Sequence, residues 1–147
     1  MPSASKGVRP ASLLHYHGRA WLLGAALTTC GATAMTNELY VVCNQNVSLR
    51  PGEVRDVFIG EKSFAGPVRL VPADNLAVQA MFLDKVVKFS ADRYVSLWTK
   101  KSFRDGASPP LVMLGDAEAI AYVRQTPGAC SYVEVAPPGG VTVIGKF

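Results

Sequence analysis

Histidine is nearly absent from this 147-residue chain, which has only His15 and His17. Catalysis by a Ser-His or Cys-His pair needs an imidazole to take the proton of the nucleophile. Zinc sites usually draw on histidine or on several cysteines, and the chain has three cysteines in all. The residues after position 34 contain no histidine and can assemble neither kind of site. We therefore expect no enzymatic activity, no catalytic residue and no metal site.

Other signals for chemistry are missing as well. The sequence contains no P-loop, no GxGxxG motif and no internal repeat, so we expect no cofactor. Its aspartates fall at expected helix starts, helix faces and turns, where capping and solvation account for them: Asp56, Asp74, Asp84, Asp92, Asp105 and Asp116.

The first 34 residues differ in composition from the rest. They contain three basic residues and no acidic one, and they include the apolar run "AWLLGAAL" (20–27) and the stretch "TTCGATA" (28–34). This layout is typical of a secretory signal peptide, and the run is shorter than the roughly 20 apolar residues that span a bilayer. We expect cleavage after Ala34 and a periplasmic mature domain over 35–147. The alternative is a lipid anchor at Cys30, because "LTTC" loosely resembles a lipoprotein box.

Positive charge is scarce once this leader is set aside. Lys plus Arg falls from 15 to 12 while Asp plus Glu stays at 11, which leaves a formal net charge of +1. Beyond the short pair Lys100 and Lys101 there is no basic stripe, so we expect no binding to nucleic acid. The chain is 49% hydrophobic and 18% charged, which favours a single globular domain with a genuine core.

Apolar strand patterns alternate with helical patterns along 35–147. The expected strands are 39–43, 67–72, 111–114, 129–135 and 141–147, and the expected helices are 51–60, a helix after Asn75, 91–103 and 116–126. Asp74 or Asn75 is the expected N-cap of the second helix, and Ser90 that of the third. This order predicts an α/β fold with a mixed, mainly parallel sheet and helices on both faces.

Two segments carry a resemblance to a known family. The segment "YVVCNQNVSLRPGEVRDVFIGEKSF" (40–64) and the later "AYVRQTPGACSYVEV" (121–135) resemble segments of phosphate ABC transporter substrate-binding proteins. The spacing from these segments to Trp98, Phe103, Gly106 and Pro109-Pro110 is similar to that of the short, single-lobe relatives. The resemblance covers residues 39 to about 135. It implies one lobe of a type II periplasmic binding protein fold.

Full-length relatives hold an anion between two such lobes, with an Arg-Asp-Ser-Gly-Ser-Gly-Thr loop at a helix N-terminus. This chain has "PADNLAVQAMF" (72–82) there, with Pro72 in place of the Arg, Leu76 in place of a Ser and Val78 in place of the Thr. Every charged or hydroxyl ligand of that loop is thus missing. What the resemblance leaves is a helix N-terminus with free N–H groups near residues 75–78.

The candidate ligand-binding residues are Asn44, Asp74 and Asn75. Asp74 and Asn75 stand beside that helix N-terminus, and Asn44, at the end of the first strand, could approach the same edge. The alternative is that Asp74 and Asn75 only cap the helix and that Asn44 only begins a turn. Asp74 would also repel an anion.

The resemblance implies a periplasmic, non-enzymatic, phosphate ABC transporter substrate-binding-like protein with a degenerate site, which holds phosphate or another small anion weakly at most. The alternative is an interaction module or sensor accessory without a small-molecule ligand. Its partner would be another protein or a second copy, because a single lobe leaves its inter-lobe face uncovered.

The same resemblance places the strand that holds Cys43 antiparallel and adjacent to the strand that holds Cys130. Both cysteines stand where the family pattern is apolar, so a disulfide between them is plausible in an oxidising compartment. Two reduced, buried thiols are the alternative. A nucleophilic role for Cys130 is not expected, since nothing basic lies nearby in the sequence to stabilise a thiolate.

Overall fold

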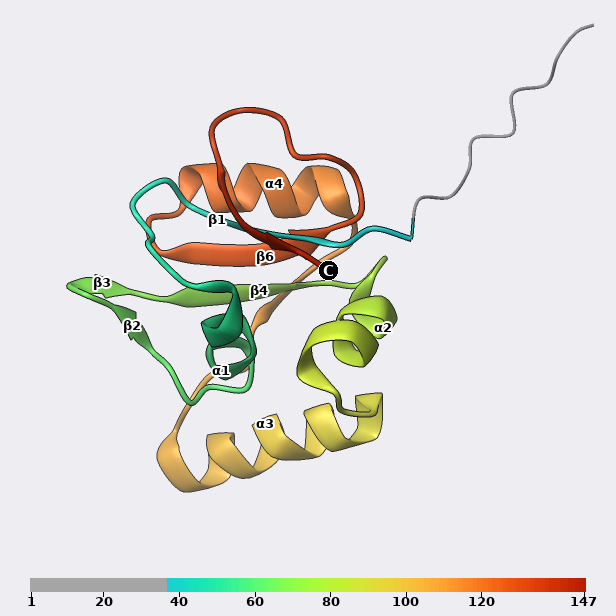
Figure 1. Cartoon of the computed structure of the whole chain (residues 1–147). Coiled ribbons are helices and arrows are strands. Elements are labelled where there is room, and N and C mark those ends of the chain that lie inside the picture. Colours follow the sequence, from blue (N-terminus) through green and yellow to red (C-terminus); the bar gives the residue numbers. More distant parts are fainter. Residues whose placement is uncertain (1–36) are drawn as a thin grey trace, which may run out of the picture. The chain divides into compact units, whose positions relative to one another are not determined.

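A five-stranded sheet lies at the centre of residues 37–147, the part of the chain that this computed structural model describes (Figure 1). The expected signal peptide, its cleavage site at Ala34 and Cys30 lie outside the described residues. In order across the sheet, the strands are β5 (Leu111–Met113), β4 (Val71–Asn75), β6 (Ala129–Val133), β1 (Tyr40–Cys43) and β7 (Thr142–Lys146).

The sheet is mixed and mainly parallel. Strand β4 runs parallel to both of its neighbours, β5 and β6, whereas β1 is antiparallel to β6 and to β7. Four of the five strands therefore point in one direction and only β1 opposes them. This arrangement confirms the predicted α/β class with its mixed sheet. A small hairpin of β2 (Phe64–Ala65) and β3 (Val68–Arg69), which was not predicted, precedes β4.

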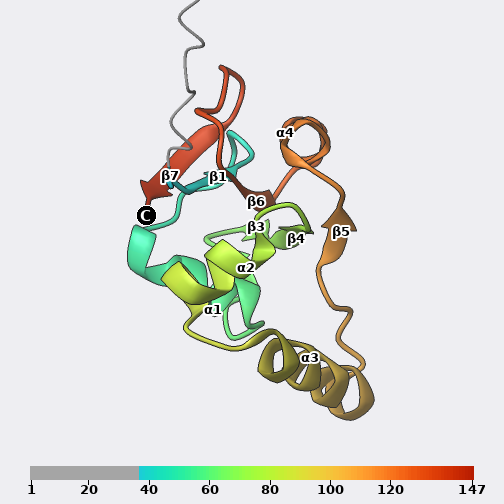
Figure 2. The same ribbon diagram turned by 90° about the vertical axis from the view of Figure 1, so that its right-hand side faces the viewer.

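The helices cover both faces of the sheet, as expected (Figure 2). One face carries α1, α2 and the longer α3, and the other face carries α4. A short 3₁₀ turn, η1, leads into α1, and α2 continues into the π-helix η2. The bounds are η1 Pro51–Glu53, α1 Val54–Phe58, α2 Gln79–Phe82, η2 Leu83–Val87, α3 Ala91–Asp105 and α4 Asp116–Gln125.

Side-chain alternation along β1 and β6 assigns residues to these two faces. Val41 of β1 and Tyr132 of β6 pack in the cluster with α1, α2 and α3, while Val42 and Val133 pack in the cluster with α4. Successive side chains of a strand point to opposite faces, so a strand covered on both sides is mostly apolar. That requirement explains the apolar character of "YVVC" and of "ACSYV", in which Ser131 is the one buried polar exception.

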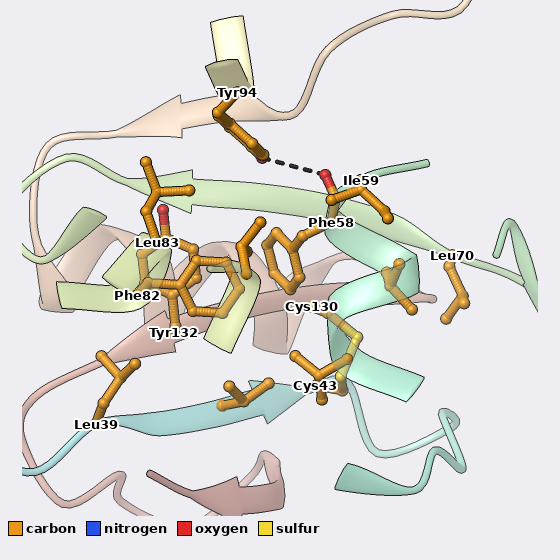
Figure 3. Close-up of a cluster of buried hydrophobic side chains, with 14 of the residues drawn as sticks. Leu39, Cys43, Phe58, Ile59, Leu70, Phe82, Leu83, Tyr94, Cys130 and Tyr132 are labelled. Atoms are coloured by element: carbon orange, nitrogen blue, oxygen red, sulfur yellow. Dashed lines mark hydrogen bonds between the residues drawn. A yellow bond between two sulfur atoms is a disulfide. The ribbon is translucent and has the colours of Figure 1, made fainter. Parts of the chain in front are cut away.

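Aromatic rings fill the larger of the two clusters (Figure 3). The rings of Phe82 and Tyr132 are stacked with centroids 3.9 Å apart, and Phe58 meets Phe82 edge-on at 4.7 Å. Offset-stacked and edge-on pairs of this kind add about 0.5–1.5 kcal/mol each beyond the burial of area. The apolar face of α1, with Val54, Val57 and Phe58, is buried in the same cluster.

Cys43 and Cys130 form a disulfide, with their sulfur atoms 2.02 Å apart (Figure 3). The two residues lie directly opposite each other in the antiparallel register of β1 and β6. Both side chains are buried in the aromatic cluster. The structure therefore shows the pairing that the resemblance implied and not the alternative of two free thiols.

The two N-cap predictions have different outcomes. Ser90 caps α3 as expected, because its hydroxyl oxygen accepts a hydrogen bond from the backbone N–H of Arg93 at 3.3 Å. The prediction that Asp74 or Asn75 caps the second helix is wrong. Strand β4 continues through Asn75, because Ala73–Asn75 pair in parallel with Leu111–Met113, and α2 begins only at Gln79.

Candidate functional site

The carboxylate of Asp74 is buried at the point where β4 ends, with only 4% of the residue exposed. Two hydroxyl groups from other elements donate hydrogen bonds to its Oδ1 atom. Tyr94 of α3 lies at 3.1 Å and Tyr132 of β6 at 3.0 Å. Asp74 therefore stands at the junction of three elements that are distant in the sequence.

Tyr94 links this carboxylate to a second acceptor. Its hydroxyl lies 3.2 Å from the carbonyl oxygen of Phe58, which also accepts a hydrogen bond from the indole N–H of Trp98 at 3.1 Å (Figure 3). A phenolic hydroxyl has one proton to donate. Tyr94 can direct it to the Phe58 carbonyl when Asp74 is protonated and to Asp74 when the carboxylate is charged.

Burial dominates the electrostatics of this group. Desolvation raises the pKa of Asp74 above its ordinary value, and the hydroxyls of Tyr132 and Tyr94 offset only part of that rise. The pKa values of both tyrosines are also raised, first by burial and then by the Asp74 charge. Within residues 37–147, no lysine or arginine offsets the burial of the Asp74 carboxylate.

A pocket of about 350 Å³ opens beside Asp74, between α3, the start of α2 and strand β5. Its wall combines two aromatic side chains with neutral polar groups and aliphatic surface. The residues that line it are Asp74, Gln79, Tyr94, Val95, Trp98, Thr99, Ser102, Pro109, Pro110 and Val112. The pocket thus presents one carboxylate and no basic side chain.

Asn75 is fully buried, and its side chain forms hydrogen bonds within the protein. Its amide nitrogen donates to Oδ1 of Asp116 at 2.6 Å and to the carbonyl of Tyr132 at 3.0 Å, and its Oδ1 accepts from the Ala77 N–H. Asp116 in turn accepts from the backbone N–H groups of Glu134 and Val135. The side chain of Asn75 joins β4 to the start of α4, and these contacts leave its amide little capacity for a ligand.

Asn44 lies at the other end of the sheet, so the prediction that it approaches the edge of Asp74 is wrong. Its amide donates to the carbonyls of Val123 and Arg124 in the last turn of α4, whereas Asn75 bonds to the first residue of that helix. The reason is the direction of β1, which runs opposite to β4 and β6.

The N–H groups expected to cradle an anion are already bonded. The Leu76 N–H donates to the carbonyl of Met113 at 2.8 Å, the Ala77 N–H to Oδ1 of Asn75, and the Val78 N–H to the carbonyl of Asn75. The N–H groups of Leu76, Ala77 and Val78 are thus not free, in contrast to what the resemblance implied. They lie in the turn before α2, which begins at Gln79 and continues into η2 as far as Val87.

Tyr94, Trp98 and Tyr132 complete the site and were missed by sequence reasoning. Sequence patterns place Tyr94 and Trp98 in the expected helix 91–103 and Tyr132 in the expected strand 129–135, without a role at a site. Both elements are observed, and all three side chains are buried. No sequence signal indicates that two of their polar ends would converge on Asp74.

Neither a metal site nor a membrane span is found in the part of the chain that the structure describes. No group of three or more His, Cys, Asp or Glu side chains is placed to hold a metal ion there. No helix of residues 37–147 combines the length and apolar character needed to cross a bilayer.

Comparison of the chain with protein-family models gives no match, and a search of curated proteins gives none either.

Proposed function

We propose that this chain is an exported, non-enzymatic binding protein, a single-lobe relative of phosphate ABC transporter substrate-binding proteins whose anion site is degenerate. The observation that carries the loss of phosphate binding is the state of the amides of Leu76, Ala77 and Val78. All three donate hydrogen bonds within the protein, and the buried acid Asp74 lies just before them in the chain. An anion at this turn would find no free donor among these three amides to replace its lost hydration.

The architecture supports kinship at the level of the lobe. Strand β1, which holds Cys43, is antiparallel and adjacent to β6, the arrangement that the resemblance implied for these strands. The family-like segment "TPGACSY" forms the turn from α4 into β6, with Gly128 in the turn and Cys130 in β6. The disulfide of Cys43 and Cys130 fits an oxidising compartment such as the periplasm.

Calorimetric titration of phosphate into the purified protein at neutral pH tests this proposal. We expect no saturable heat, because the pocket has no basic side chain and the amides of residues 76–78 already donate hydrogen bonds within the protein. A dissociation constant in the micromolar range would contradict the proposal. N-terminal sequencing of the exported protein tests its location, with a start at Met35 expected and a retained leader or a lipid-modified Cys30 as the contrary results.

A second candidate, a protein-interaction module, is favoured by one of the two edges of the sheet. Strand β5 forms this edge and β7 forms the other. Leu111 and Val112 of β5 are more than half exposed, and Leu114 just after it is 75% exposed. Edge strands of soluble proteins usually carry charges that prevent pairing, and this one carries none. Sedimentation analysis of the wild type and of Leu114→Lys tests for self-association through this edge.

A further inference from the structure

We propose that the pocket beside Asp74 binds a small organic cation, with an ammonium group facing the carboxylate and an alkyl chain lying along the aliphatic wall. The inference rests on the proposed function of a binding protein and goes further, since it names a ligand class of opposite charge to phosphate. The pocket is defined by the residues given above around Asp74, Tyr94 and Trp98.

The carboxylate of Asp74 is buried without a counter-ion. Only 4% of the residue is exposed, and among the described residues no salt bridge reaches it. Tyr94 and Tyr132 donate hydrogen bonds to Oδ1, and the side chain of Gln79 is a third neutral donor to this carboxylate. A carboxylate offers about four acceptor positions on its two oxygens, so these donors do not use all of them. A buried charge without a counter-ion is costly, and a bound cation supplies that counter-ion.

The wall of the pocket also favours a cation. Tyr94 and Trp98 present aromatic rings to it, and a cation near the face of such a ring gains about 0.5–2 kcal/mol. The remaining polar side chains, Gln79, Thr99 and Ser102, are neutral. With a carboxylate and no basic side chain, the pocket repels an anion and accepts a cation.

The size and polarity of the pocket define the ligand further. A volume of about 350 Å³ lies at the lower end of the range of small-molecule sites. Val95 is 63% exposed and Val112 is 56% exposed, so aliphatic surface lies uncovered on opposite sides of the pocket. A short alkyl chain attached to the ammonium group would cover this surface, which identifies an alkylamine as the smallest suitable probe.

Protonation of Asp74 opposes binding of the cation, because burial raises the pKa of this carboxyl in the free protein. The groups that face it are Tyr94 from α3, Tyr132 from β6 and Gln79 from α2, and the pKa values of both tyrosines are shifted upward. Asp74 is charged only when deprotonated, and burial shifts this deprotonation to higher pH. Affinity for the cation is therefore expected to fall as the pH drops.

The test compares butylamine with 1-butanol, its neutral isostere, by calorimetry on the purified protein at about pH 8. The indole N–H resonance of Trp98, identified with Trp98→Phe, reports whether binding occurs in this pocket. We expect saturable binding of butylamine, accompanied by a shift of this resonance. We expect 1-butanol to bind at least about tenfold more weakly than butylamine, and a tenfold ratio corresponds to about 1.4 kcal/mol.

Two variants separate the pocket from the general surface charge. Asp74→Asn keeps the shape of the side chain and removes its charge, and we expect butylamine to bind about tenfold more weakly to it. The matched control is Asp84→Asn, since Asp84 is exposed on η2 outside this pocket, and it is expected to leave the affinity unchanged. The comparison of butylamine with 1-butanol and the pH series need only the wild-type protein.

The outcomes also separate this inference from the proposed function. Equal binding of butylamine and 1-butanol, or no binding of either, overturns the cation site. The proposed function stands in that case as long as phosphate also fails to bind. Loss of affinity in Asp84→Asn but not in Asp74→Asn likewise overturns it. Micromolar binding of phosphate contradicts the proposed function itself.

Discussion

At the scale of the single residue, Asp74 determines the character of the site. It is a buried acid at the end of β4 whose partners are two tyrosine hydroxyls and no basic side chain. Neutral donors stabilise a buried carboxylate less than an ion pair with additional hydrogen bonds does. The folded chain consequently retains an acid that favours protonation or an external counter-ion.

We predict that Asp74→Asn raises the free energy of unfolding, and more so at about pH 7 than at about pH 4. An acid whose pKa is higher in the folded than in the unfolded chain binds more protons when folded, so it favours folding at low pH. This contribution is lost as the pH rises through the folded-state pKa, which burial raises for Asp74 above its ordinary value of 3.8. Asparagine does not titrate and avoids that loss.

Urea unfolding of both proteins at the two pH values measures the effect. The exposed Asp84→Asn is the control, and its stability is expected to stay within about 0.5 kcal/mol of the wild type. A gain from Asp74→Asn that is larger at pH 4 than at pH 7 would show that burial does not govern this carboxyl.

At the scale of the element, the turn from α4 into β6 explains a glycine of the family-like segment. Gly128 has a φ of +80°, and a Cβ added there would lie 2.0 Å from the carbonyl oxygen of Arg69. The turn therefore needs a residue that tolerates both a left-handed conformation and the close approach of the chain before β4.

We predict that Gly128→Ala destabilises the protein much more than Gly106→Ala does. Gly106 ends α3 with a φ of +64°, but an added Cβ there meets no atom within 4 Å. Gly106→Ala thus measures the cost of the left-handed conformation alone, about 1–2 kcal/mol, and the difference between the variants measures the clash. Thermal unfolding of both is the assay, and equal losses would contradict the close approach.

The disulfide of Cys43 and Cys130 joins β1 to β6 covalently. It closes a loop with a sequence separation of 87 residues, and the chain-entropy model assigns such a loop about 4–5 kcal/mol. We predict that the double variant Cys43→Ala/Cys130→Ala loses stability of this order in urea unfolding. Mass spectrometry of the native protein should show a mass lowered by two hydrogens, whereas two alkylatable thiols would contradict the bond.

At the scale of the whole molecule, patterns within one segment predicted the structure well, and contacts between segments did not follow from them. Helical periodicity and Ser90 place α3, and apolar runs place β1 and β6. The length of β4 could not be predicted, because "ADN" becomes a strand only through its pairing with β5. Local preference for a helix cap was overridden by a pairing partner that lies 38 residues further along the chain, as in Asp74 with Val112.

The candidate site was predicted only in part for the same reason. Asp74 and Asn75 do lie together at the end of one strand, but the side chain of Asn75 is used internally. Asn44 was assigned to the wrong end of the sheet because the direction of β1 was not taken into account. The convergence of Tyr94 and Tyr132 on Asp74 depends on three-dimensional packing alone.

We expect the amides of the turn between β4 and α2 to be closed to an anion, because all three already donate hydrogen bonds within the protein. Nitrogen-15 NMR reads the amides of Leu76, Ala77 and Val78 directly while phosphate is added. We predict that their signals stay in place and that hydrogen exchange at Leu76, bonded to Met113, is unchanged by phosphate. Saturable shifts confined to these three amides, with a micromolar midpoint, would contradict it.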